Sequence, residues 1–170
     1  MKFLKKFFTC ALLPAAILAS CTFRYSFSGA SISPDAKTFS VAFFPNMAPL
    51  VNPALSSEFT EALKMKFITG TRLNQIDDGG DLSFEGEITG YAVTPQAITA
   101  GEVAAMNRLT ISVRVKFVNK VDNAQSFDKS FSQYDDYDSQ QDLAAVESTL
   151  VANVLEKLME DIFNASVANW

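Results

Sequence analysis

The stretch Arg108-Leu-Thr-Ile-Ser-Val-Arg-Val-Lys-Phe117 decides the fold class, because apolar and polar side chains alternate along its whole length. Successive side chains of a β-strand point to opposite faces of a sheet, so this strand has one apolar and one polar face. Its polar face carries three cations, Arg108, Arg114 and Lys116. We therefore predict a half-buried strand whose apolar side chains form part of the core.

Other strands and two helices flank this stretch. Composition and spacing predict strands at 38–44, 82–94 and 126–134 and a short one at 72–76, with helices at 55–69 and 140–167. Gly70 is expected to end the first helix, and Ser139 to cap the second with Asp142 in the capping-box position. This order favours an α/β (α+β) fold, a two-layer sandwich in which two helices cover one face of a mostly antiparallel or mixed sheet of about four to five strands.

The segment 82–94 contains two glycines, Gly86 and Gly90, which indicate a bulge or a close backbone approach. Strict alternation places both glycines on the same face as Phe84, Ile88 and Ala92. Tyr91 and Val93 would then lie on the outer face, where they are candidate contacts for a partner protein. Isolated exposed apolar residues are the alternative explanation.

The first 20 residues have the pattern of a secretory signal peptide. Three lysines lie within the first six residues, and the stretch 7–18 is apolar apart from Thr9. As a helix, that stretch spans about 18 Å, too short for the ~30 Å hydrocarbon core of a bilayer. The quartet Leu18-Ala-Ser-Cys21 resembles the bacterial lipobox, which implies cleavage before Cys21 and lipid attachment to its thiol. An ordinary signal peptide that is cut near a cysteine is the alternative.

The lipobox resemblance divides the chain into a signal peptide at 1–20, a lipidated tether at 21–37 and a folded domain at 38–170. One acyl chain holds a protein at a membrane only marginally, whereas several chains on Cys21 would form a stable anchor. By resemblance to other lipoproteins, Thr22 in place of an aspartate favours the outer membrane. The lack of an acidic run after Cys21 favours the periplasmic side over the cell surface.

Composition excludes several classes of function. The net charge of −5 becomes −8 once a segment with three lysines is removed, so we do not expect a nucleic-acid-binding protein. The chain has no histidine, and its cysteines are Cys10 and Cys21. Ser-His-Asp and Cys-His catalysis are thereby excluded, and no cofactor or metal is expected. An enzyme would need a carboxylate pair such as Glu85 and Glu87, about 7 Å apart on one strand face.

Four segments resemble the lipopolysaccharide-assembly lipoproteins, the LptE-like family. They are Tyr25-Ser-Phe-Ser-Gly-Ala-Ser-Ile-Ser-Pro34, Phe84-Glu-Gly-Glu-Ile-Thr-Gly-Tyr-Ala-Val-Thr-Pro95, Asn107-Arg-Leu-Thr-Ile-Ser-Val-Arg-Val-Lys-Phe117 and Asp161-Ile-Phe-Asn-Ala-Ser-Val-Ala-Asn-Trp170. The resemblance implies an outer-membrane protein without enzymatic activity. It implies that the protein binds lipopolysaccharide and that it plugs, and helps to assemble, the LptD-type β-barrel translocon. The family has no motif that fixes its ligand-binding positions, so none is carried over.

Two charged clusters are candidate binding sites. Arg108, Arg114 and Lys116 are candidates for lipopolysaccharide, because cations on a polar sheet face can form charge-assisted hydrogen bonds with phosphate oxygens. An ordinary solvated strand face is the alternative. The second cluster precedes the second predicted helix and consists of Asp135, Asp136 and Asp138. Calcium binding would explain it, and the preference of acidic residues for a helix N-terminus explains it more simply.

A different resemblance leaves the partner open. Val41-Ala-Phe-Phe-Pro-Asn46, followed by a helix and by Arg72-Leu-Asn-Gln-Ile76, also resembles the N-terminal unit of TolB-type and curli-secretion-type domains. That resemblance implies a periplasmic accessory lipoprotein of a Tol or secretion system. The two hypotheses differ in the partner that should co-purify with the chain.

Overall fold

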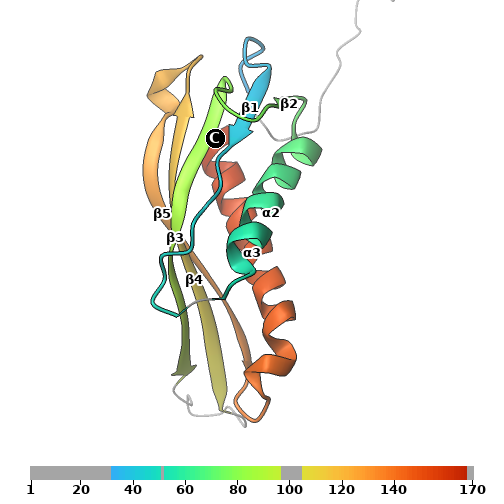
Figure 1. The fold of residues 1–170 in the computed structure, drawn as a ribbon, viewed down its shortest axis with the longest axis vertical. Helices are drawn as coiled ribbons and strands as arrows, with labels where there is room; N and C mark the ends of the chain where they lie inside the picture. The colour runs from blue at the N-terminus through green and yellow to red at the C-terminus, as the bar shows by residue number, and fades with distance from the viewer. Residues whose placement is uncertain (1–31, 51, 97–104, 168–170) are drawn as a thin grey trace, which may run out of the picture.

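A computed structural model describes residues 32–50, 52–96 and 105–167, and in these ranges five strands form one mixed sheet in the order β2-β1-β3-β4-β5. The strands are β1 (Thr38–Val41), β2 (Asn74–Gln75), β3 (Leu82–Gln96), β4 (Met106–Asn119) and β5 (Phe127–Asp138). β1 pairs in parallel with β2 and β3, whereas β3, β4 and β5 are antiparallel. The helices α2 (Leu55–Gly70) and α3 (Leu143–Val167) lie on one side of the sheet (Figure 1). The predicted two-layer fold class is confirmed.

The core lies between the sheet and the two helices. The predicted alternation of β4 is confirmed, since its inner face is fully buried along Leu109, Ile111, Val113, Val115 and Phe117. The apolar stripe of α3 faces these side chains with Leu150, Val154, Leu158 and Ile162. The other face of β4 is left for polar side chains, so the fold presents a polar outer sheet face.

The helix boundaries agree with prediction at α2 and differ at α3. α2 ends at Gly70 as expected, whereas α3 begins at Leu143, three residues after the predicted start. Ser139 does not cap α3, because β5 continues to Asp138 and a turn follows it. The Asp142 carboxylate accepts a hydrogen bond from the Ala144 amide at 3.2 Å, so Asp142 caps the helix instead.

The chain after β1 follows β3 without forming a regular strand. β1 ends at Val41 rather than at the predicted residue 44. Beyond it, the Ile88 amide donates to the Pro45 carbonyl at 2.9 Å and the Met47 amide donates to the Ile88 carbonyl at 2.8 Å. Pro45 has no N–H to donate, which interrupts a regular ladder. The short strand predicted at 72–76 is limited to Asn74 and Gln75.

The bulge indicated by the glycines of β3 is present, and it inverts the second half of the strand. Ile88 is opposite Val113 and Gly90 is opposite Ser112, so Thr89 is the extra residue. Tyr91 consequently points into the core, where it is only 4 % exposed, and Val93 packs against the same core. The prediction that Tyr91 and Val93 face a partner is therefore wrong, because it assumed strict alternation across the bulge.

Asp81 joins the first residues of β1 to the start of β3. One of its carboxylate oxygens, Oδ2, accepts hydrogen bonds from the Lys37 amide (2.9 Å), the Thr38 amide (3.0 Å) and the Thr38 hydroxyl (2.9 Å). The bond from the Lys37 amide, followed by those from Thr38, lowers the pKa of Asp81 below its ordinary value. The ionised carboxylate therefore stabilises the folded state.

We expect Asp81→Asn to lower stability at neutral pH and to remove part of its pH dependence. Because the pKa of Asp81 is lower in the folded than in the unfolded state, its contribution is present above the ordinary aspartate value of about 4 and is lost as the pH falls below it. Urea midpoints at pH 7 and pH 3 measure this: the gap between variant and wild type should be smaller at pH 3. Asp35→Asn, at an exposed site, is the control and should show no gap. A gap for Asp81→Asn that is equal at both pH values would contradict the assignment.

Candidate functional site

The outer face of the sheet carries the three predicted cations, which we call the cation row: Arg108, Arg114 and Lys116. Each cation is bound to an acid on a neighbouring strand. Arg108 binds Asp136 through two hydrogen bonds of 2.7 and 2.8 Å, and Arg114 binds Asp128 through two of 2.8 and 2.7 Å. Lys116 Nζ lies 2.5 Å from Glu85 Oε1. The cations lie on the predicted face, and the sequence did not indicate their acidic partners.

These ion pairs fix the charge state of their acids. The hydrogen bond from Arg114 lowers the pKa of Asp128, and the one from Arg108 lowers the pKa of Asp136. Both carboxylates therefore stay ionised to a lower pH than an ordinary aspartate does. The outer face is a pattern of alternating charges rather than a field of one sign.

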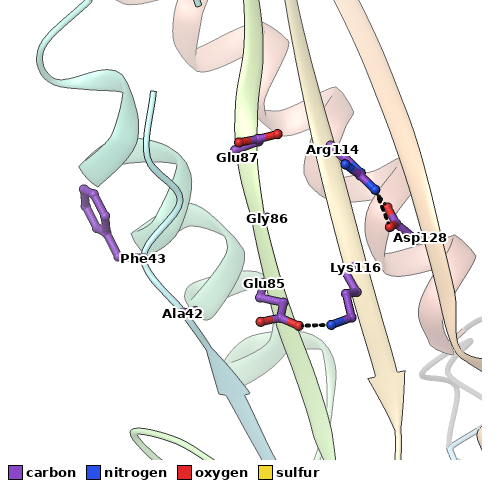
Figure 2. A pocket seen from close by; sticks show the side chains of 8 residues that line it. All are labelled: Ala42, Phe43, Glu85, Gly86, Glu87, Arg114, Lys116 and Asp128. Carbon is purple, nitrogen blue, oxygen red and sulfur yellow. Dashed lines mark hydrogen bonds and ion pairs between the residues drawn. The ribbon is translucent and has the colours of Figure 1, made fainter. Parts of the chain in front are cut away.

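Arg114 and Lys116 share a shallow hollow on this face, whereas Arg108 lies apart. Figure 2 shows the two cations of β4 between the acids of β3 and Asp128 of β5. The hollow has a volume of about 480 Å³ and is lined by Ala42, Phe43, Glu85, Gly86, Glu87, Arg114, Lys116 and Asp128. Arg108 is six residues from Arg114 along β4, about 20 Å at the usual strand rise. The structure therefore brings together two of the three predicted residues.

The two ends of the cation row differ in accessibility. The side chains of Arg114 and Lys116 are each 55 % exposed, and that of Arg108 is 29 % exposed. The guanidinium carbon of Arg108 also lies 3.6 Å from the centre of the Tyr134 ring, a cation–π contact. Arg108 is thus held by a carboxylate and an aromatic ring, while the cations of the hollow are open to solvent.

Gly86 forms part of the hollow, and its position requires a glycine. A Cβ atom at this residue would lie 2.0 Å from the Arg114 carbonyl oxygen and 2.7 Å from the Phe44 ring. The close backbone approach indicated by the sequence is therefore confirmed here. Glu85 and Glu87, the carboxylate pair that an enzyme would need, lie on either side of Gly86. Glu85 is bound to Lys116, so the two carboxylates are not both free.

The aspartate cluster belongs to β5 and is divided between the two faces of the sheet. Asp135 faces α3, where it accepts hydrogen bonds from Asn153 (2.8 Å) and Lys157 (2.9 Å), whereas Asp136 faces outward to Arg108. The explanation by a helix N-terminus is wrong, because α3 begins only at Leu143. Within the ranges 32–50, 52–96 and 105–167, no group of three or more His, Cys, Asp or Glu residues is placed to hold a metal ion.

A polar contact that the sequence did not predict joins β3, α3 and the segment before α2. The Tyr91 hydroxyl donates to Glu147 Oε1 at 2.6 Å, and Asn52 Nδ2 donates to the same oxygen at 3.0 Å. Burial, followed by the hydrogen bond to Glu147, raises the pKa of Tyr91 above its ordinary value. Tyr91 therefore stays protonated and serves as a donor. The bulge in β3 produces this contact, since it turns Tyr91 inward.

The predicted signal peptide, Cys21 and most of the predicted tether lie outside the described residues. Among the described helices, none is both long and apolar enough to cross a membrane.

Comparison with known proteins assigns the chain to a family. A protein-family model described as LptE, lipopolysaccharide-assembly, matches residues 36–166. The chain belongs to the LptE family. Its members are non-enzymatic accessory lipoproteins, and membership makes the chain an outer-membrane lipoprotein of lipopolysaccharide assembly. The match to LptE covers the five strands, the hollow and the whole cation row.

Solved structures share the fold of this LptE-family chain at low sequence identity. A minor lipoprotein from Acinetobacter baumannii is 16 % identical with a TM-score of 0.51, covering 76 % of this chain and 91 % of that one. A hypothetical protein from Chlamydia trachomatis is 9 % identical with a TM-score of 0.53, covering 79 % and 99 %. A protein from Xanthomonas campestris is 11 % identical with a TM-score of 0.51, covering 81 % and 90 %. No curated protein matches the chain.

Proposed function

We propose that the chain is the lipopolysaccharide-binding subunit of an outer-membrane translocon and has no enzymatic activity. In this proposal lipid on Cys21 holds it on the periplasmic side of the membrane. There it plugs an LptD-type β-barrel and assists the assembly of that barrel. The family match supports a role in lipopolysaccharide assembly. The observation that carries the binding role is the cation row on the outer sheet face.

The geometry of the cation row suits anionic oxygens. Arg114 and Lys116 lie two residues apart on one strand face, about 7 Å at the usual rise, so both can reach the same phosphorylated headgroup. A guanidinium can bind two phosphate oxygens at once, and an ammonium adds a compact charge beside it. Both side chains are half exposed, which leaves them accessible to a ligand as large as lipopolysaccharide.

The rim of the hollow adds an apolar surface to this charged site. Phe43 lies on the segment that follows β1 and is 61 % exposed. Lipopolysaccharide is an amphiphile, so a site with both exposed cations and an exposed aromatic ring matches its two kinds of surface. The proposal therefore places the phosphates at Arg114 and Lys116, with Arg108 as a second, less accessible contact.

Reversing all three charges, with Arg108→Glu, Arg114→Glu and Lys116→Glu together, should weaken lipopolysaccharide binding about tenfold or more. Each exposed cation contributes modestly, and three losses plus the new repulsion combine to an effect of this size. Titration of the purified chain with lipopolysaccharide measures the affinity directly. Among the partial variants, the pair Arg114→Glu and Lys116→Glu should account for more of the loss than Arg108→Glu alone.

The matched control reverses three cations elsewhere, with Lys64→Glu, Lys66→Glu and Arg72→Glu. Lys64 and Lys66 lie on α2, on the opposite side of the sheet from the cation row, and Arg72 follows that helix. The control changes the net charge by the same amount, so it should leave binding close to the wild-type level. Unchanged binding in the cation-row variant, or equal losses in both variants, would refute the assignment of the site.

A further inference from the structure

Carboxylates of the same chain already occupy one fork of donors, Nε and Nη2, on both arginines of the cation row. Asp128 engages Nε and Nη2 of Arg114, and Asp136 engages the same two nitrogens of Arg108. They form one of the two forks through which an arginine can bind a phosphate with two parallel hydrogen bonds. A phosphate therefore cannot bind at this fork until the carboxylate leaves it.

We infer that Asp128 and Asp136 compete with the anionic ligand for the arginines of the cation row and thereby lower its affinity. This inference rests on the proposed lipopolysaccharide site and adds the groups that set its affinity. A phosphate that binds at the Nε–Nη2 fork displaces the carboxylate, and the carboxylate returns when the phosphate leaves. The affinity of the site for its anionic ligand is therefore lower than it would be if the arginines were unpaired. A lower affinity favours release of the ligand over its retention.

Exposure makes the exchange feasible at Arg114 in particular. The side chains of this pair are 55 % and 43 % exposed, whereas those of Arg108 and Asp136 are 29 % and 32 % exposed. Exposed ion pairs are weak because water solvates both partners once they separate. The Arg114 pair should therefore open first, and Arg108, which also contacts Tyr134, should open last.

The charges around the hollow oppose an anion as long as the acids stay in place. Its lining contains two cations, Arg114 and Lys116, and three carboxylates, Glu85, Glu87 and Asp128. Strand register fixes these positions. Glu87 is opposite Arg114, and Lys116 lies between Glu85 on one neighbouring strand and Asp128 on the other. An incoming phosphate thus meets a slightly negative site, and loss of one carboxylate changes the balance in its favour.

Replacement of the acids by their amides tests the inference, because it predicts a gain of binding. Asp128→Asn and Asp136→Asn keep the shape of the side chain and remove its charge. Titration of the full chain with purified lipopolysaccharide should give an affinity about two- to fivefold tighter for each variant, the range set by an exposed ion pair. Thermal unfolding should show no gain in stability, since an ion pair is lost. A purely structural role of the acids would leave the affinity unchanged.

Glu58→Gln is the matched control, because it removes one negative charge from α2 on the opposite side of the sheet. It should bind as the wild type does, and an equal gain in this variant would overturn the inference as an effect of net charge. Amide variants that bind no tighter than the wild type, while the charge reversals still weaken binding, overturn the inference and leave the proposed site intact. Unchanged binding in the amide and reversal variants alike overturns both.

Discussion

Phe67→Ala should lower the free energy of unfolding by about 3–5 kcal/mol, the cost of removing a buried aromatic ring and leaving a cavity. Phe67 is fully buried on α2, and its ring centre lies 5.7 Å from that of Phe39, 4.6 Å from Phe84 and 5.3 Å from Phe163. Those rings belong to β1, β3 and α3. The substitution therefore opens a cavity where both helices meet the sheet.

Phe43→Ala is the matched control, because it makes the same change at a side chain that is 61 % exposed. Its cost should stay within about 0.5 kcal/mol, as is usual for a surface position. Urea denaturation of both variants measures the two free energies. A loss for Phe67→Ala no greater than that for Phe43→Ala would contradict the packing of this core.

Cys21→Ser should abolish lipid attachment and release the chain from the membrane fraction. A serine hydroxyl cannot form the thioether that carries the diacylglyceryl group. Membrane binding by acyl chains contributes about 0.8 kcal/mol for each buried methylene, so loss of the chains removes the anchor entirely. The expected result is no incorporation of labelled palmitate and recovery of the chain in the soluble fraction after an alkaline wash.

Cys10→Ser supplies the control for the anchor, since Cys10 lies within the predicted signal peptide and is the only other cysteine of the chain. This variant should incorporate palmitate and fractionate as the wild type does. Palmitate incorporation by Cys21→Ser at the wild-type level would show that the lipid is attached elsewhere.

The accuracy of the sequence-based fold prediction depends on how regular each element is. β4 could be predicted face by face, because its alternation is unbroken from Leu109 to Phe117. The faces of β3 could be predicted only as far as Ile88. Gly90 indicates a bulge, but the local sequence does not show that Thr89 is the extra residue or that the two faces exchange beyond it. The start of α3 was misplaced because Ser139 and Asp142 have the spacing of a capping box, whereas a turn follows Asp138 and Asp142 itself caps the helix.

Only part of the candidate site could be predicted from the sequence, because part of it depends on local alternation and part on strand register. Strand alternation places Arg108, Arg114 and Lys116 on one face, and this follows from local sequence. Their partners depend on register between strands: Asp136 is 28 residues from Arg108, and Glu85 is 31 residues from Lys116. Pairing over such separations is set by the whole sheet. The ion pairs, on which the inferred competition at the arginines rests, could therefore not be predicted from the sequence.

Affinity purification of the full chain from detergent-extracted membranes tests the central claim most directly. The account predicts that one large outer-membrane β-barrel protein co-purifies in stoichiometric amount together with lipopolysaccharide, and that mass spectrometry identifies it as an LptD-type translocon. Recovery of Tol or curli-secretion components in stoichiometric amount, without such a barrel, would contradict the account.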